Sequence, residues 1–295
     1  MKSFSTYIIS EEHNGFTVEN YLKQVLQCSG RKIQKLTRLK GIRLNGKPVF
    51  LQRTLKSGSS LQVMNLEDTS YGVIPEPGNV DILYEDSYML ILNKPARQLV
   101  HPTGQTQSGT LANHLAYFLQ NRGTLTTIRA IHRLDRDTSG CVIFAKDSKS
   151  QSILEQQLKS NTLKRTYIAL VKSFITPPSG IIDAPIGPHP TMPNRRAVAE
   201  NGEPAVTHYK TIRTLNEASL LELQLDTGRT HQIRLHLAYQ DCPIIGDGMY
   251  GVRSPAISRQ ALHASAVTFN NLKDHGEITI EAPLPPDFIN ALSKL

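Results

Sequence analysis

The sequence predicts an α+β protein, in which a larger domain with a mixed, mostly antiparallel sheet is preceded by a small α/β domain. Three observations lead to this expectation. The 295 residues exceed the commonest size of a single domain. A stretch rich in proline and glycine divides the chain near residue 70. Beyond it, predicted strands outnumber predicted helices and do not alternate regularly with them, which argues against a doubly wound sheet.

The small domain is expected over residues 12–66. Apolar residues recur at helical spacing over residues 18–26, and a second helical pattern covers residues 31–40. Asn45 and Gly46 then separate two short apolar segments, as in a two-residue hairpin. This order of elements predicts a helix pair followed by a small antiparallel sheet.

The second predicted helix has a basic face, and Gly41 is expected to end it. That face is either a surface that contacts phosphates or a solvated helix face, since charge alone does not distinguish them. Its basic residues are Arg31, Lys32, Lys35 and Arg38.

A linker is expected over residues 67–79, which contain prolines and glycines and few large apolar side chains. The larger domain is expected over residues 80–295. Its predicted strands cover residues 82–85, 89–93, 141–145, 166–171, 205–213, 220–225, 262–269 and 277–281. Its predicted helices cover residues 110–120, 148–159 and 229–239.

Composition limits the class of protein. The formal net charge of +8 favours a polyanionic partner, although a basic protein without such a partner is the alternative. The three cysteines are far apart and form no C-x-x-C pair, which argues against a disulfide framework and a thiolate zinc site. No apolar stretch approaches membrane-spanning length and no cleavable leader is recognisable, so a cytoplasmic protein is expected.

The densest polar cluster runs from His132 to Gly140, just before a predicted apolar strand. Loops at strand ends often carry catalytic groups. Asp135 lies between Arg133 and Arg136, whose charges favour an ionised carboxylate suited to nucleophilic or electrostatic work. A surface loop with satisfied charges is the alternative.

A second cluster, residues 227–236, leads into a predicted helix that Asp226 or Thr227 is expected to cap. Arg234 follows an apolar residue, so we expect it to be partly buried and to need a carboxylate partner. The two histidines of this cluster are five residues apart and make a poor metal-binding pair. An amphipathic basic helix on the surface is the alternative.

Two further residue sets have competing interpretations. Tyr167 alternates with apolar residues in a predicted strand, where its ring either packs in the core or stacks on a base. His132, Asp135 and Asp137 would suit a metal hydrolase, but no convincing distant ligand accompanies them.

Residues 132–140 resemble the H-R-L-D-x-x-T-S-G signature of the RluA-type RNA pseudouridine synthases. Segments similar to the other family motifs follow in order, and the resemblance extends from residue 80 to the C-terminus. They are residues 92–95 with 100–102, the tyrosine strand 165–171, the G-R-x-H-Q-I-R-x-H motif at 228–238, the G-D-x-x-Y-G turn at 246–251, and 262–264 with 282–285. The chain departs from the family at Ala96, Arg165 and residues 202–205.

The resemblance implies isomerisation of uridine to pseudouridine in RNA. The bond from the ribose anomeric carbon to the base nitrogen breaks, and carbon 5 of the turned uracil bonds to the same ribose carbon. The family pattern makes Asp135 the catalytic carboxylate and Arg133 the residue that fills the space of the flipped base. It places Tyr167 against the base, with a share in removing the carbon 5 proton, and Arg234 beside Asp135. Neither a cofactor nor a metal is expected, and the step that Asp135 performs stays open.

Residues 12–66 resemble the small RNA-binding domain named after ribosomal protein S-four, which implies RNA contacts at the basic helix face. Large-subunit ribosomal RNA is the expected substrate and transfer RNA the second choice, with the protein acting as a monomer. A non-catalytic RNA-binding or ribosome-assembly factor of the same fold is the competing hypothesis.

Overall fold

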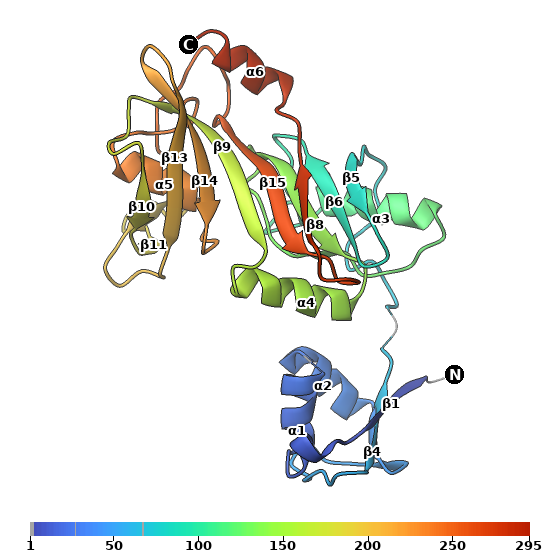
Figure 1. Cartoon of the computed structure of the whole chain (residues 1–295). Coiled ribbons are helices and arrows are strands. Elements are labelled where there is room, and N and C mark those ends of the chain that lie inside the picture. Colours follow the sequence, from blue (N-terminus) through green and yellow to red (C-terminus); the bar gives the residue numbers. More distant parts are fainter. Residues whose placement is uncertain (1–2, 27, 67) are drawn as a thin grey trace. The chain divides into compact units, whose positions relative to one another are not determined.

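The computed structural model describes residues 3–26, 28–66 and 68–295. The chain divides into two compact units, Met1–Thr69 and Ser70–Leu295, and each has a hydrophobic core of its own (Figure 1). In the part of the chain so described, no helix is both long enough and apolar enough to cross a membrane. The three cysteines are buried and unpaired.

The smaller unit contains an antiparallel sheet that, over its described residues, has the order β1-β4-β2-β3. Asn45 and Gly46 form the predicted turn, with the positive φ angles, 50° and 81°, that a tight hairpin requires. The first strand precedes residue 12, where the small domain was expected to begin. The strands are β1 (Phe4–Ile8), β2 (Ile42–Leu44), β3 (Lys47–Pro48) and β4 (Ser60–Met64).

The helices of this unit pack their apolar side chains, including Leu22, Ile33 and Leu36, against the sheet. The second helix starts at Gly30, because Ser29 caps it by accepting the N–H of Lys32 at 3.3 Å. It ends at Arg38 and not at residue 40, since Lys40 itself takes a left-handed conformation. The elements are the 3₁₀ helix η1 (Glu11–His13), α1 (Val18–Asn20), the π-helical turn η2 (Tyr21–Val25) and α2 (Gly30–Arg38).

The larger unit is built on one sheet, whose described strands follow the order β10-β13-β14-β9-β15-β8-β6-β5 (Figure 1). Strand β16 pairs with β15, and β7 pairs with β8. Among the described pairings of this sheet, only β15 with β8 is parallel, so the predicted mixed, mostly antiparallel α+β fold is confirmed. The strands are β5 (Ile82–Glu85), β6 (Met89–Lys94), β7 (Arg129–Ala130), β8 (Ser139–Ala145), β9 (Lys164–Lys172), β10 (Ser179–Asp183), β13 (Val206–Thr214), β14 (Ala218–Leu225), β15 (Leu262–Asn270) and β16 (Glu277–Glu281).

Both faces of this sheet are covered by helices. Alternate residues of β6 point to opposite faces, so Met89 shares a core cluster with Leu154 of α4, while Leu92 shares another with Leu115 of α3 and Leu237 of α5. A separate hairpin, β11 (Ile186–Pro188) with β12 (Arg196–Val198), lies beside α5. The helices are α3 (Leu111–Asn121), α4 (Ser148–Lys159), α5 (Gln232–Tyr239) and α6 (Pro286–Leu292).

Residues 70–79, expected in the linker, hydrogen-bond to the larger unit. The carbonyl oxygen of Tyr71 accepts the N–H of Ile128 at 2.8 Å. Nδ2 of Asn113 in α3 donates to the carbonyl oxygen of Ile74 at the same distance. This stretch therefore follows the surface of the larger unit as ordered chain.

The parallel pair β8 and β15 determines where the polar cluster lies. Gly140 has a φ of 110°, and a Cβ there would be only 2.1 Å from the carbonyl oxygen of Ala264. Only glycine permits so close an approach. Since parallel strands begin at the same edge, the loop before β8 meets the residues before β15, and Gln260 donates to the hydroxyl of Thr138 at 3.3 Å.

Candidate active site

The loop of residues 132–138 is held by buried cations that bind its backbone. Lys94 is fully buried, and its Nζ donates to three carbonyl oxygens at 2.7 to 3.0 Å, those of Pro95, Gln98 and Arg136. Burial lowers the pKa of this ammonium to about 7. Arg259 donates to the carbonyl oxygen of Asp137 at 3.1 Å. Asp135 therefore extends from a loop whose next two residues are anchored through their carbonyl oxygens.

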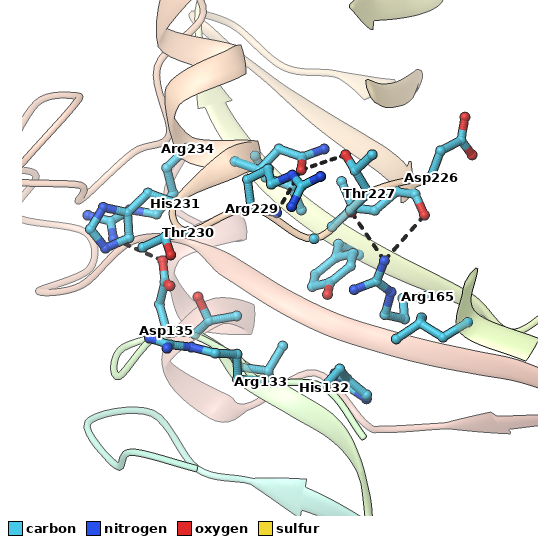
Figure 2. Close-up of a pocket in the computed structure, with 18 of the residues that line it drawn as sticks. His132, Arg133, Asp135, Arg165, Asp226, Thr227, Arg229, Thr230, His231 and Arg234 are labelled. Carbon is cyan, nitrogen blue, oxygen red and sulfur yellow. Dashed lines mark hydrogen bonds and ion pairs between the residues drawn. The ribbon is translucent and has the colours of Figure 1, made fainter. Parts of the chain in front are cut away.

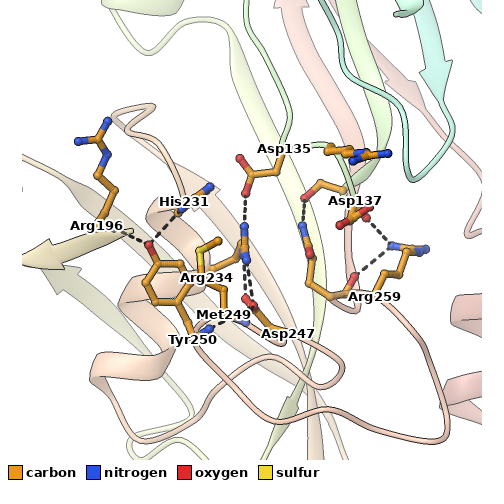
Figure 3. Close-up of polar contacts among 12 residues, drawn as sticks. Asp135, Asp137, Arg196, His231, Arg234, Asp247, Met249, Tyr250 and Arg259 are labelled. Carbon is orange, nitrogen blue, oxygen red and sulfur yellow. Dashed lines mark hydrogen bonds and ion pairs between the residues drawn. The ribbon is translucent and has the colours of Figure 1, made fainter. Parts of the chain in front are cut away.

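Arg234, in the first turn of α5, joins two carboxylates (Figure 3). Its Nη1 donates to Asp135 at 3.0 Å, while its Nε and Nη2 donate to the two oxygens of Asp247 at 2.7 and 2.9 Å. The side chain of Asp247 is 1% exposed and that of Asp135 is 19% exposed. The bidentate pair with Asp247 fixes the guanidinium plane, so that its remaining nitrogen faces Asp135.

The expected contact between Arg234 and Asp135 is present, and Asp247 is a second carboxylate partner of Arg234 that the sequence prediction missed. Burial alone would lower the pKa of Arg234, but the hydrogen bonds and charges of Asp247 and then of Asp135 raise it. Burial would raise the pKa of Asp247, but the hydrogen bonds and charge of Arg234 lower it below its usual value. A full positive charge is therefore held next to Asp135.

Tyr250 supports Arg234 from the same turn as Asp247. Its ring centroid is 5.3 Å from Cζ of Arg234, within range of a cation–π contact. Its phenol oxygen accepts the backbone N–H of Arg196 at 2.7 Å and lies 3.1 Å from Nδ1 of His231 (Figure 3). The G-D-x-x-Y-G turn thus contributes both a carboxylate and a ring to the position of Arg234.

Asp135 and Arg234 line a pocket of about 540 Å³, a size that accommodates a nucleoside (Figure 2). Tyr167 of β9 and Leu262 of β15 provide apolar walls. Burial raises the pKa of Tyr167, so its phenol stays protonated. Among the described residues this phenol has no hydrogen-bond partner, and it is therefore free to donate to a bound molecule.

Arg133 lies beside Asp135 at the margin of this pocket (Figure 2). Its side chain is exposed, and within the described residues no carboxylate is paired with it. The four predicted site residues of the larger unit, Arg133, Asp135, Tyr167 and Arg234, therefore line one pocket.

Arg165, where the related motif has lysine, is buried at the other end of the pocket. Its Nη2 donates to the carbonyl oxygen of Thr227 at 3.1 Å (Figure 2). It thus ties β9 to the loop that precedes α5.

The start of α5 differs from the prediction. The helix begins at Gln232 and not at residue 229, because His231 has a left-handed conformation with a φ of 61°. Asp226 or Thr227 was expected to cap it, but no side chain caps this helix. The hydroxyl of Thr227 donates to Oε1 of Gln232 at 2.8 Å, and that oxygen also accepts the N–H of Arg229, so Gln232 ties the start of the helix to the preceding loop.

His132, Asp135 and Asp137 do not converge as a metal site. Nε2 of His132 accepts the N–H of Ile143 at 3.3 Å, and burial lowers the pKa of this imidazole to about 3. Asp135 faces Arg234 instead. No group of three or more histidine, cysteine, aspartate or glutamate side chains suited to a metal ion occurs in the described ranges.

The basic face of α2 belongs to the smaller unit. Lys35 and Arg38 are exposed and Lys32 is half-buried, while the apolar side chains of the helix are turned inward. The side chain of Arg31 lies outside the described residues.

Comparisons with known proteins agree with this geometry. Residues 88–239 match the family model described as RNA pseudouridylate synthase. The chain is 42% identical over 285 residues to the uncharacterized RNA pseudouridine synthase YhcT of Bacillus subtilis (strain 168), covering 96% of this chain and 94% of that protein. It is 35% identical over 266 residues to ribosomal large subunit pseudouridine synthase D of Xanthomonas campestris pv. campestris, covering 85% of this chain and 80% of that protein.

A solved structure shows the same fold. The human protein RNA pseudouridylate synthase domain containing 4 superposes with a TM-score of 0.60 at 25% identity, covering 72% of this chain and 92% of that chain. The family model, the curated relatives and this likeness show that the chain belongs to the RluA-type family of RNA pseudouridine synthases, isomerases that act on RNA.

Proposed function

We propose that this enzyme isomerises specific uridines of large-subunit ribosomal RNA, with Asp135 as the catalytic carboxylate. The observation that carries this proposal is the contact between Asp135 and Arg234 at the wall of the 540 Å³ pocket. A carboxylate fixed by a charged arginine, and open to the pocket on its other side, is suited to meet an electron-poor carbon of the ribose or the uracil.

Three further residues complete the proposed site. Arg133 fills the space left in the RNA when the target base is turned out, because its guanidinium is exposed at the pocket margin. Tyr167 packs against the extruded uracil and donates through its protonated phenol. Arg234 orients Asp135.

The reaction needs no added group. The bond between the ribose anomeric carbon and the base nitrogen breaks, and a bond from that carbon to carbon 5 of uracil replaces it. Carbon 5 loses a proton and the nitrogen gains one. We further propose that the enzyme acts as a monomer.

We propose an RNA-binding role for residues 12–66, joined through residues 67–79 to a catalytic domain at residues 80–295. Support comes from the exposed side chains of Lys35 and Arg38 on α2. Lys32 and Arg31 belong to the same predicted face. Arginine and lysine on one helix face contact phosphates with little sequence preference.

The ribosomal substrate is supported by relatives such as the Xanthomonas enzyme, whose name states that substrate. Pseudouridines mapped in total RNA from a deletion strain, against its parent, test it. We expect sites to disappear from large-subunit ribosomal RNA and to return with the wild-type gene but not with Asp135→Asn. If pseudouridines disappeared only from transfer RNA, transfer RNA and not ribosomal RNA would be the substrate. Unchanged pseudouridines in all RNA would contradict the proposed function.

A further inference from the structure

A second cleft of about 910 Å³ lies next to the active-site pocket and shares Arg234 with it. Asp247 lines this cleft, so the buried pair that orients Asp135 forms part of the partition between the two cavities. Asp137, two residues beyond Asp135, also reaches it. A strand of RNA whose target nucleotide enters the first cavity passes close to the second.

Two loops supply much of the lining of this cleft. One is the turn between β11 and β12, which carries Met192 and Arg195. Nδ1 of His189 accepts the N–H groups of Thr191 and Met192 at 3.3 and 3.2 Å, which holds this turn in shape. The other is the segment before β15, which includes Arg253.

The charges of the cleft are unevenly satisfied. Arg259 is neutralised by Asp287 at 2.7 and 2.9 Å, and Arg234 by its own carboxylates. Arg195 and Arg253 have no carboxylate partner in the described part of the chain, and they share the cleft with one further acid, Asp137. The cleft therefore presents two available guanidiniums.

The lining between these charges is partly apolar. Met192 is 43% exposed within the cleft, and Ile257 and Met249 contribute further apolar surface. The guanidinium of Arg253 lies over Gly248, where an added Cβ would meet its Nε at 3.8 Å. Guanidinium groups beside apolar side chains match the chemistry of a ribose-phosphate chain with unstacked bases more than that of a small anion.

We propose that this second cleft binds the unpaired RNA strand next to the target uridine, with phosphates on Arg195 and Arg253 and a neighbouring base or ribose against Met192. The proposal rests on the proposed function, because it takes RNA in the first pocket as given. It extends the substrate contacts from one nucleotide to the flanking strand.

The test measures the affinity of the full chain for a short single-stranded oligouridylate over a series of salt concentrations. The double variant Arg195→Ala/Arg253→Ala removes both proposed phosphate contacts. Since each contact on a single strand adds about 0.7 to the slope of log affinity against log salt, we expect the slope to shrink by about 1.4. The pair Arg195→Lys/Arg253→Lys keeps both charges and should retain most of the slope.

A matched control, Lys210→Ala/Arg213→Ala, removes two exposed cations from β13 and should leave the slope unchanged. Equal unfolding midpoints by circular dichroism show that each variant is folded. If Arg195→Ala/Arg253→Ala has the wild-type slope, or the control loses as much, the inference is overturned. Tritium release from carbon-5-labelled ribosomal RNA by the wild type reports separately on the proposed function, so either can fail alone.

Discussion

Arg234 contacts Asp135 through one nitrogen and Asp247 through two, so a single guanidinium links a carboxylate at the pocket wall to a buried one. The arrangement makes the orientation of Asp135 depend on a residue that never reaches the pocket. Breaking one member of such a buried set leaves an uncompensated charge, which costs about 3–5 kcal/mol.

Replacing Arg234 by lysine keeps the charge but not the geometry. One ammonium cannot bind both carboxylates as the planar guanidinium does. We expect kcat for tritium release to fall at least about tenfold, equivalent to about 1.4 kcal/mol of transition-state stabilisation, with a smaller change in KM. Arg213→Lys on β13 is the matched control. Wild-type kcat in Arg234→Lys would show that the bidentate geometry is unnecessary.

The stability of the larger unit should fall in acid below about pH 4. Arg234 lowers the pKa of Asp247 in the folded protein, against the effect of burial. The ionised carboxylate therefore stabilises the fold at any pH above its pKa in the unfolded chain, about 3.9, and this stabilisation is lost as the pH falls through the lower pKa of the folded protein. Urea unfolding should therefore give a declining free energy of unfolding below about pH 4. Asp247→Asn should be less stable at neutral pH and decline less steeply in acid. Parallel curves for variant and wild type would rule out this linkage.

Removing only the hydroxyl of Tyr167 tests whether the phenol takes part in the reaction, because the ring still packs against the base. Because burial raises its pKa, the phenol is a donor near neutral pH, and no described residue accepts from it. We expect Tyr167→Phe to lower kcat at least about tenfold while RNA affinity changes little, since proton transfer typically contributes a hundredfold or more. Tyr167→Leu should weaken both. Full activity in Tyr167→Phe would restrict the residue to packing against the base.

The family motifs predicted the residues of the site, while local patterns left their roles open and indicated only what a side chain would need. An arginine beside an apolar helix residue indicated a buried charge that requires an acid, and Arg234 has two. The identity of Asp247 was missed because periodicity does not encode which side chain a turn brings to α5. The parallel pairing at Gly140 is hidden for the same reason, since the glycine is explained only by the carbonyl of Ala264 that it meets.

The boundaries were missed where residues other than glycine adopt left-handed conformations. His231 delays α5 and Lys40 ends α2 early, and a positive φ is uncommon for any residue other than glycine, so neither was expected there. The strands β1, β7, β10, β11 and β12 were not predicted either. Three of them, β7, β11 and β12, have only two or three residues, too few to show an alternation.

The basic helix of the smaller unit should affect affinity and not chemistry. Lys35→Ala/Arg38→Ala removes two exposed charges from α2. We expect the slope of log RNA affinity against log salt concentration to shrink by about 1.4. The kcat at saturating RNA should stay within about twofold of the wild type. Anisotropy titrations and initial rates measure the two quantities. A fall in kcat with unchanged affinity would contradict this assignment.

Asp135→Asn keeps the size of the side chain and removes the charge that Arg234 contacts. Tritium release from RNA labelled at carbon 5 of uridine, with RNA affinity measured alongside, tests the role of Asp135 most directly. We expect release at the background rate and affinity within about twofold of the wild type, because general RNA binding depends on the cationic residues. Release by Asp135→Asn at a rate comparable to the wild type would contradict the assignment of Asp135 as the catalytic carboxylate.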